Sequence, residues 1–317
     1  QQPVGNSDVE ITPIGLGGGN WGREIDEESS WRVMDYAAEK GITFFDTGEL
    51  YGGRESWMNR QRSGGTTEQR EATLEPQSSE KIIGRWMHSR GCRNQITIST
   101  KLGTGGSAEN VKNFLSGSLE RLQTEYVDIF KIHNYDNTTP VTETVHAMSD
   151  EVDAGRAKIL GFANHTADQL QESLDASASG GFHSYQVAQI KYNLLMREME
   201  PEMFPLCQQK GIVISSYSPI GAGFLTGKYS PDFSQIPFNS RFSITPGHAK
   251  EYMTKDNFRV LDLLREKSTE VGISIIKLSM AWAMTHPAIT AVLIGARTPK
   301  HIDNALDARQ IGIDPDL

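Results

Sequence analysis

Short apolar runs alternate with longer amphipathic segments along this chain. Apolar runs begin near residues 11, 43, 95, 127, 157, 185, 212 and 289. Between them, apolar residues recur at helical spacing, as Leu170 and Leu174 do one turn apart. Strict alternation of short strands with helices is typical of a parallel sheet. Eight such units predict a (β/α)8 barrel, a TIM barrel, formed by residues 1–317 as a single domain.

The predicted helices follow from the same pattern. We expect them at 26–40, from 79 onward, and at 107–122, 141–154, 167–176, 202–210, 256–271, 274–285 and from 299 onward.

Two stretches interrupt the repeat. Residues 54–78 are polar, lack an apolar period and predict a long loop inserted after the second strand. Residues 220–250 are irregular and rich in proline. Because residues 54–78 begin beside Tyr51, we expect them to form a lid or a partner contact rather than a loop without function.

A glycine run near the start resembles a dinucleotide-binding fingerprint. Residues 17–22, GGGNWG, match G-x-G-x-x-G, and an acidic residue, Asp46, follows about twenty residues later. In that fingerprint the helix opens inside the glycine run and faces the pyrophosphate. Here the helix is expected only near Asp26. We therefore interpret the glycines as a tight loop that passes close to a ligand.

Composition narrows the range of partners. The 317 residues carry a net charge of −9 without a basic block, so nucleic acid and anionic membrane surfaces are not expected partners. No run of about 18 apolar residues predicts a membrane span. Cys92 and Cys207 have no metal-ligand spacing, so we expect no metal site and a reducing compartment, the cytoplasm. Since the chain opens at Gln1, a removed signal stays open.

Four ionisable residues stand at or just after predicted strand ends. Asp46 ends the second strand and Tyr51 follows it, while Lys101 and His133 end the next two strands. The carboxyl ends of barrel strands are where the chemistry of such folds is found. Singly, each residue has a structural explanation: a helix cap, a packed aromatic ring, an exposed lysine or a core histidine. Their order and common placement favour a joint function.

These side chains suit carbonyl reduction. Such a reaction needs a proton donor, and a tyrosine with a reference pKa of about 10 keeps its proton near neutrality. An ammonium beside Tyr51 would lower its pKa, and a carboxylate would hold the ammonium in place. Lys101 and Asp46 fit those roles. His133 could donate a hydrogen bond to the substrate oxygen.

The ordered set, with flanking segments from GLGGGNWG to LIGARTPKHIDNA, resembles the aldo-keto reductase family over nearly the whole chain. The resemblance implies that Tyr51 is the general acid/base, that Lys101 and Asp46 tune it, and that His133 positions the carbonyl. It implies an NADP(H)-dependent oxidoreductase that interconverts an aldehyde, ketone or sugar and its alcohol by hydride transfer. Trp21, Tyr51, His133 and Asn134 are expected to contact this small substrate.

The resemblance also implies a cofactor, NADP, with NAD left open. The amides of Asn164 and Gln189 would bind the nicotinamide carboxamide, and the ring of Tyr217 would stack on the nicotinamide. Arg297 would pair with a 2′-phosphate, although His301 and Ala305 depart from the family pattern. The expected cofactor contacts are Gly19, Asn20, Trp21, Asn164, Gln189, Tyr217, Ser218, Ile220, Gly221, Ala222, Leu225, Gly295, Arg297, His301 and Asn304.

Two alternatives stay open at this point. One is a nicotinamide-binding regulatory subunit with little turnover, similar to the channel β-subunits of this family. The other is a barrel hydrolase that uses Asp46 and Glu49 as paired carboxylates. The sequence also leaves a homo-oligomer open.

Overall fold

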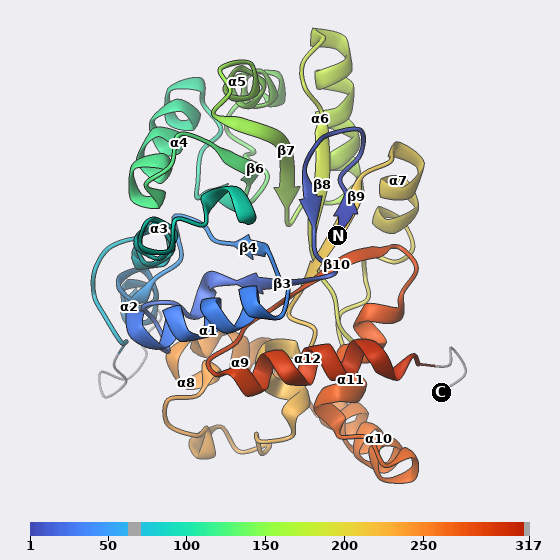
Figure 1. Ribbon diagram of the computed structural model, residues 1–317. Helices are drawn as coiled ribbons and strands as arrows, with labels where there is room; N and C mark the ends of the chain where they lie inside the picture. The colour runs from blue at the N-terminus through green and yellow to red at the C-terminus, as the bar shows by residue number, and fades with distance from the viewer. Residues whose placement is uncertain (63–70, 314–317) are drawn as a thin grey trace.

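Eight parallel strands close into a barrel in the computed structural model, which describes residues 1–62 and 71–313 (Figure 1). Around the barrel the strands follow the order β10-β3-β4-β5-β6-β7-β8-β9, so chain neighbours are also spatial neighbours. The predicted (β/α)8 fold is therefore confirmed. The strands are β3 (Ile14–Gly17), β4 (Phe44–Asp46), β5 (Thr97–Leu102), β6 (Val127–Ile132), β7 (Ala157–Ala163), β8 (Tyr185–Lys191), β9 (Val213–Tyr217) and β10 (Ile289–Ile294).

Helices surround this barrel, and side chains mark where several of them begin. Asp26 accepts a hydrogen bond from the backbone N–H of Ser29, and Thr166 forms a capping box with Gln169. The helices are α1 (Glu27–Glu39), α3 (Ser78–Arg90), α4 (Ala108–Leu122), α5 (Val141–Asp153), α6 (Ala167–Gly180), α7 (Met203–Lys210), α10 (Lys255–Val271), α11 (Ile275–Thr285) and α12 (Pro299–Ile311). All begin within one residue or so of the predicted positions.

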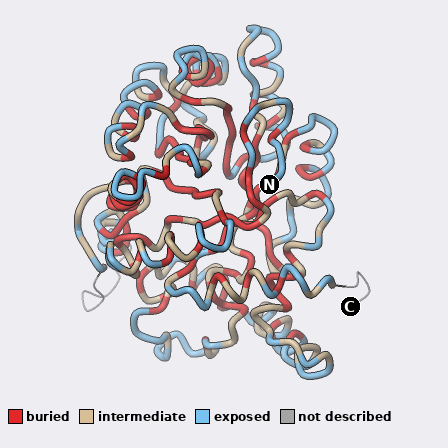
Figure 2. The backbone as a smooth tube through the Cα atoms, viewed as in Figure 1, coloured by how far each residue is buried: buried red, intermediate tan, exposed pale blue. Residues whose placement is uncertain are grey.

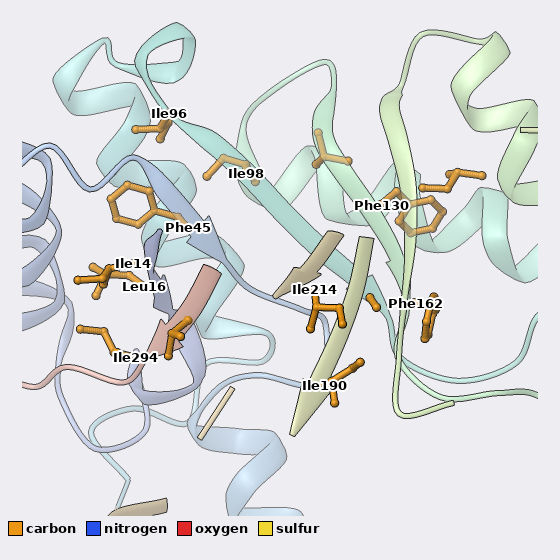
Figure 3. Close-up of a cluster of buried hydrophobic side chains, with 14 of the residues drawn as sticks. Ile14, Leu16, Phe45, Ile96, Ile98, Phe130, Phe162, Ile190, Ile214 and Ile294 are labelled. Atoms are coloured by element: carbon orange, nitrogen blue, oxygen red, sulfur yellow. The ribbon is translucent and has the colours of Figure 1, made fainter. Parts of the chain in front are cut away.

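The larger apolar core lies between the strands and the helices. Figure 2 shows buried residues along the strands and exposed residues on the outer turns of the helices. In Figure 3, Leu16, Phe45 and Ile294 from three neighbouring strands lie close together. The ring of Phe45 also packs 5.3 Å from that of Trp86 on α3, so Trp86 belongs to this core.

A smaller apolar cluster fills the inside of the barrel. It joins Phe44, Ile129, Ile159 and Val187 of the strands to the N-terminal hairpin formed by β1 (Gln2–Pro3) and β2 (Glu10–Ile11). The apolar run that begins near residue 11, predicted as the first strand, is therefore divided: Ile11 pairs within the hairpin, and the barrel strand begins only after Pro13. The hairpin covers one end of the barrel, so polar side chains can gather only at the opposite end.

The insertion after the second strand contains a helix that was not predicted. Residues Gly53–Arg62 form α2, whereas a loop was expected over 54–78. Its buried face carries Arg60 instead of an apolar stripe, so apolar periodicity does not detect it. The Arg60 side chain is 0% exposed, pairs with Glu71 and donates to the backbone carbonyl of Ile244 at 3.1 Å. The rest of the predicted loop includes residues 63–70, which lie outside the described residues.

The irregular stretch after β9 carries its own small core. It contains 3-10 helices at Gly221–Thr226 and Phe233–Gln235, then α8 (Arg241–Ile244) and α9 (Pro246–Tyr252). The rings of Tyr229 and Phe242 stack with centroids 4.0 Å apart inside this cluster. Figure 1 shows α8 and α9 below α1, and α10 apart from them at the lower right, next to α11.

Within residues 1–62 and 71–313, no helix combines the length and the apolar character that crossing a bilayer requires.

Candidate active site

The structure brings the four predicted catalytic residues together at the carboxyl ends of neighbouring strands. The ammonium of Lys101 donates to Asp46 Oδ2 at 2.7 Å and to the backbone carbonyl of Thr47 at 2.6 Å. It also lies 4.5 Å from the centroid of the Tyr51 ring. The ring of His133 meets that of Tyr51 edge-on, with centroids 5.8 Å apart. One phenol, one ammonium, one carboxylate and one imidazole therefore share a single site.

Asp46 is an ionised carboxylate inside the barrel. Its side chain is 2% exposed, and burial by itself would raise its pKa. The charges of Lys101 and Lys131 more than offset that effect, and they hold the pKa of Asp46 far below its usual range. Asp46 is thus a fixed negative charge that anchors its partners.

The pKa of Tyr51 corrects one expectation. Instead of being lowered by Lys101, it is raised above 10, first by desolvation of the phenol and then by the charge of Asp46. The ammonium of Lys101 is paired with Asp46, which compensates part of its charge at the phenol. Tyr51 therefore keeps its proton near neutrality and is available as an acid.

His133 is neutral near pH 7. Desolvation, followed by the charge of Lys101, lowers the pKa of this imidazole to about 4. Its Nδ1 atom is buried and has no hydrogen-bond partner among the described residues. A neutral imidazole offers one donor and one acceptor nitrogen, so His133 can still donate a hydrogen bond to a substrate oxygen.

Lys131 is a member of this cluster that sequence reasoning missed. It lies on β6, directly opposite Lys101 of β5, and its ammonium donates to Asp46 Oδ1 at 2.8 Å. The signal was present in the segment VDIFKIH, because residues two apart on a strand face the same side. Lys131 and His133 therefore both point into the barrel.

The two amides predicted at the nicotinamide lie beside the catalytic group. Gln189 donates from Nε2 to Asp46 Oδ2 at 2.9 Å, and its buried Oε1 has no partner among the described residues. Asn164 donates to the backbone carbonyl of His133 at 3.0 Å and accepts from the Tyr217 hydroxyl at 2.8 Å. Gln189 thus has an unpartnered carbonyl oxygen to offer a carboxamide.

A backbone cradle follows β9. Gly221, Ala222 and Gly223 have φ angles of 56°, 51° and 94°, a run of left-handed conformations that favours glycine. Ser218 before them is also left-handed, with φ 59°, and the side chain of Ile220 packs against the core. Such a turn can present backbone N–H groups to phosphate oxygens.

Two of the predicted contact residues are buried side chains. Leu225 is 0% exposed and packs in the small core under the cradle. Trp21 is 1% exposed and packs against Phe45, with ring centroids 6.4 Å apart. The neighbouring Gly19 lies at the rim, where an added Cβ would stand 3.4 Å from the guanidinium of Arg23.

Basic side chains gather near the cradle, and two of them were not predicted. Arg241 pairs with Glu24 at 2.8 Å and donates to Asn20 Oδ1 at 3.3 Å. The pKa of Lys228 is lowered by desolvation and then by the charge of Arg297. The signal for Lys228 is its place directly after Gly227 of the glycine-rich segment, whereas Arg241 lies farther along the chain. These guanidinium and ammonium groups suit phosphate oxygens.

The remaining predicted residues lie at the rim or at the start of α12. Arg297 donates to the backbone carbonyl of Asn239 at 3.0 Å, and His301 Nδ1 lies 2.9 Å from the Thr298 hydroxyl. An added Cβ on Gly295 would stand 3.0 Å from Asn20 Nδ2. Asn304 is half-buried, and Asn134 is exposed.

Comparison with known proteins supports an oxidoreductase. The chain is 29% identical to a probable voltage-gated potassium channel subunit beta of Oryza sativa subsp. japonica, over 97% of this chain and 90% of that protein. It is 26% identical to an uncharacterized oxidoreductase, YrpG, of Bacillus subtilis (strain 168), over 99% and 92%. It is 27% identical to probable aldo-keto reductase 1 of Glycine max, over 97% and 84%. Since the model of the Aldo/keto reductase family matches residues 13–316, from the first barrel strand through the last helix, this chain belongs to that family.

Proposed function

We propose that this protein is an NADP(H)-dependent oxidoreductase that interconverts a small carbonyl compound and its alcohol. The observation that carries the proposal is a protonated Tyr51 beside the Lys101–Asp46 pair and a neutral His133, all at the carboxyl ends of the barrel strands. An acid, a charge that stabilises its conjugate base and a hydrogen-bond donor for the substrate are what carbonyl reduction requires of a protein.

Each residue has a distinct part in the proposed mechanism. Tyr51 donates its hydroxyl proton to the carbonyl oxygen in reduction and takes it back in oxidation. Lys101 stabilises the phenolate that this transfer leaves, and Asp46 keeps Lys101 in place by a 2.7 Å hydrogen bond. His133 holds the substrate oxygen near the phenol. A bound nicotinamide supplies or accepts the hydride.

The residues present fit such a cofactor. The unpartnered carbonyl of Gln189 suits a carboxamide N–H, and the left-handed backbone at Gly221–Gly223 suits a pyrophosphate. Arg297, with the nearby Lys228, suits a 2′-phosphate. These features favour NADP over NAD.

A titration tests that preference. We expect Arg297→Ala to weaken NADPH binding about 10- to 100-fold and NADH binding less than about twofold, because one charge-assisted hydrogen bond contributes about 1.5–3 kcal/mol. Tryptophan fluorescence reports both dissociation constants. The control is Arg309→Ala, an exposed cation near the other end of α12. Equal losses for the two cofactors would contradict the assignment of Arg297.

A regulatory subunit is the second candidate, because the rice relative and one of Arabidopsis thaliana are both named as probable channel β-subunits. That function predicts cofactor binding with slow turnover of every carbonyl tested and a defined hetero-oligomer. A hydrolase finds less support, since both oxygens of Asp46 accept hydrogen bonds from lysines. Cys92 and Cys207 are free buried thiols, which supports the proposal of a reducing compartment, the cytoplasm.

A further inference from the structure

One buried carboxylate serves two ammonium groups beneath the proposed reaction site. Asp46 accepts hydrogen bonds from Lys101 and from the amide of Gln189 at Oδ2, and from Lys131 at Oδ1. The two lysine side chains are 1% and 0% exposed. A simple ion pair needs only one lysine, so the second requires an explanation.

The strands beside Lys131 are shaped to hold it. β6 places Lys131 between Lys101 of β5 and Gly161 of β7. A Cβ added to Gly161 would stand 2.9 Å from Lys131 Cγ, so the glycine leaves space for the lysine stem. Among the described residues, the hydrogen bonds of the Lys131 ammonium go to Asp46 alone. The side chain is therefore committed to the catalytic carboxylate.

The second ammonium changes the charge of the site. Asp46 and Lys101 alone sum to zero, whereas Asp46 with both protonated lysines sums to +1. A further carboxylate that acts on Lys101, Glu80 of α3, is itself paired with Arg121. Two further titratable groups face this cluster: His133, directly after β6, and Tyr51, whose pKa is also influenced by the charge of Arg23. His133 and Tyr51 therefore lie beside a cluster with a net positive charge, whereas Asp46 and Lys101 alone would form a neutral pair.

We propose that Lys131 is a positioning residue that keeps a net positive charge under Tyr51 and His133, by taking one oxygen of Asp46 and leaving the charge of Lys101 only partly compensated. This inference rests on the proposed function where it concerns Tyr51: the extra charge favours the phenolate that remains after proton transfer. It is independent of that function where it concerns His133, because the same charge disfavours the imidazolium in the free protein.

The titration of Lys131 itself agrees with this role. Burial, with a further contribution from the charge of Lys101, lowers its pKa to about 8, against the partial compensation from Asp46. Lys131 is therefore charged near neutrality. Above about pH 8 it loses its proton, and the cluster returns to the neutral sum of a single pair.

The first experiment measures the pKa of His133 in the protein without cofactor. Lys131→Gln keeps a hydrogen-bond donor for Asp46 but removes the charge, and Lys131→Met removes both. NMR titration of isotope-labelled histidines, with His133→Asn for assignment, should show the proton affinity of His133 rising about tenfold in both variants. His165 is the internal control. Its pKa is also lowered to about 4, but by burial without a lysine, so its titration should stay unchanged.

The second experiment measures the pH profile of alcohol oxidation. In both variants kcat at pH 7 should fall about tenfold while the KM for NADP stays within about twofold, and the difference in kcat from the unchanged protein should narrow above about pH 8, where Lys131 is itself neutral. Lys158→Gln is the matched control, since Lys158 pairs with Asp128 on a neighbouring strand, away from Asp46.

The outcomes separate the two proposals. If the unchanged protein shows no turnover but the proton affinity of His133 still rises in the Lys131 variants, the proposed enzymatic function is overturned and the role of Lys131 stands. An unchanged His133 in Lys131→Gln would overturn that role. So would a Lys131→Gln protein that fails to fold, because it would show a purely structural lysine.

Discussion

Replacing Tyr51 with phenylalanine is expected to lower kcat for carbonyl reduction by about a thousandfold, within the range that a general acid contributes. The change removes one hydroxyl and keeps the ring. Its edge contact with His133 and its place near the Lys101 ammonium therefore persist. NADPH binding should stay within about twofold, because the loss lies in the chemical step. Single-turnover kinetics and the fluorescence titration measure the two quantities separately.

The matched control is Tyr126→Phe. Tyr126 lies just before β6, at the opposite end of the barrel strands, with its hydroxyl 3.5 Å from Asn94 Oδ1. Its kcat should equal that of the unchanged protein. A Tyr51→Phe variant with ordinary turnover would remove Tyr51 from the mechanism. Equal loss in both variants would point to a general effect on folding.

Replacing Asp46 with asparagine is expected to lower the free energy of unfolding by about 3–5 kcal/mol at pH 7, because two buried ammonium groups lose their counter-ion. Urea denaturation measures this change. Asp35→Asn is the control. Asp35 pairs with Arg90 at a partly exposed site, and its loss should cost about 1 kcal/mol or less.

The effect of Asp46→Asn on the free energy of unfolding is expected to depend on pH. In the unchanged protein the pKa of Asp46 lies far below its unfolded value of about 3.9. Its stabilisation is therefore present above that unfolded value and is lost as the pH falls through the folded one. In the asparagine variant the buried lysines lose the partner that raised their pKa values, whereas unfolded lysine stays near 10.4.

The unfolded variant therefore binds more protons than the folded variant, and its stability rises with pH towards about 10. The difference in the free energy of unfolding between the variant and the unchanged protein should decrease between pH 7 and pH 10. A difference that does not depend on pH would mean that lost packing, and not unpaired charge, explains the destabilisation.

Strand positions were predictable where burial is continuous. Val127–Ile132, Ala157–Ala163 and Tyr185–Lys191 begin at the predicted positions because both faces of each strand are largely packed, which produces mainly apolar runs. The first strand was predicted too long because apolar character continues through Pro13 into the hairpin. Helix α2 was missed because a charged side chain, Arg60, occupies its buried face.

The site was predictable to the extent that strand ends determine it. Asp46, Lys101 and His133 were located by their places at the ends of apolar runs, and the barrel brings such ends together. Lys131 was overlooked although its spacing from His133 places both on one face of the strand, because its partner Asp46 comes from a distant part of the chain. The inward orientation of Trp21 likewise depends on Phe45, a contact between distant segments.

The link from Arg60 to the backbone of Ile244 has a consequence for the design of chimaeras. Deleting residues 53–77 to shorten the barrel mouth would also remove the donor to Ile244, the last residue of α8. That short helix carries Arg241, which bonds to Asn20 and Glu24 at the first loop. Three segments far apart in the gene are thus structurally interdependent, and a loop graft from a relative should transplant α2 and α8 as a pair.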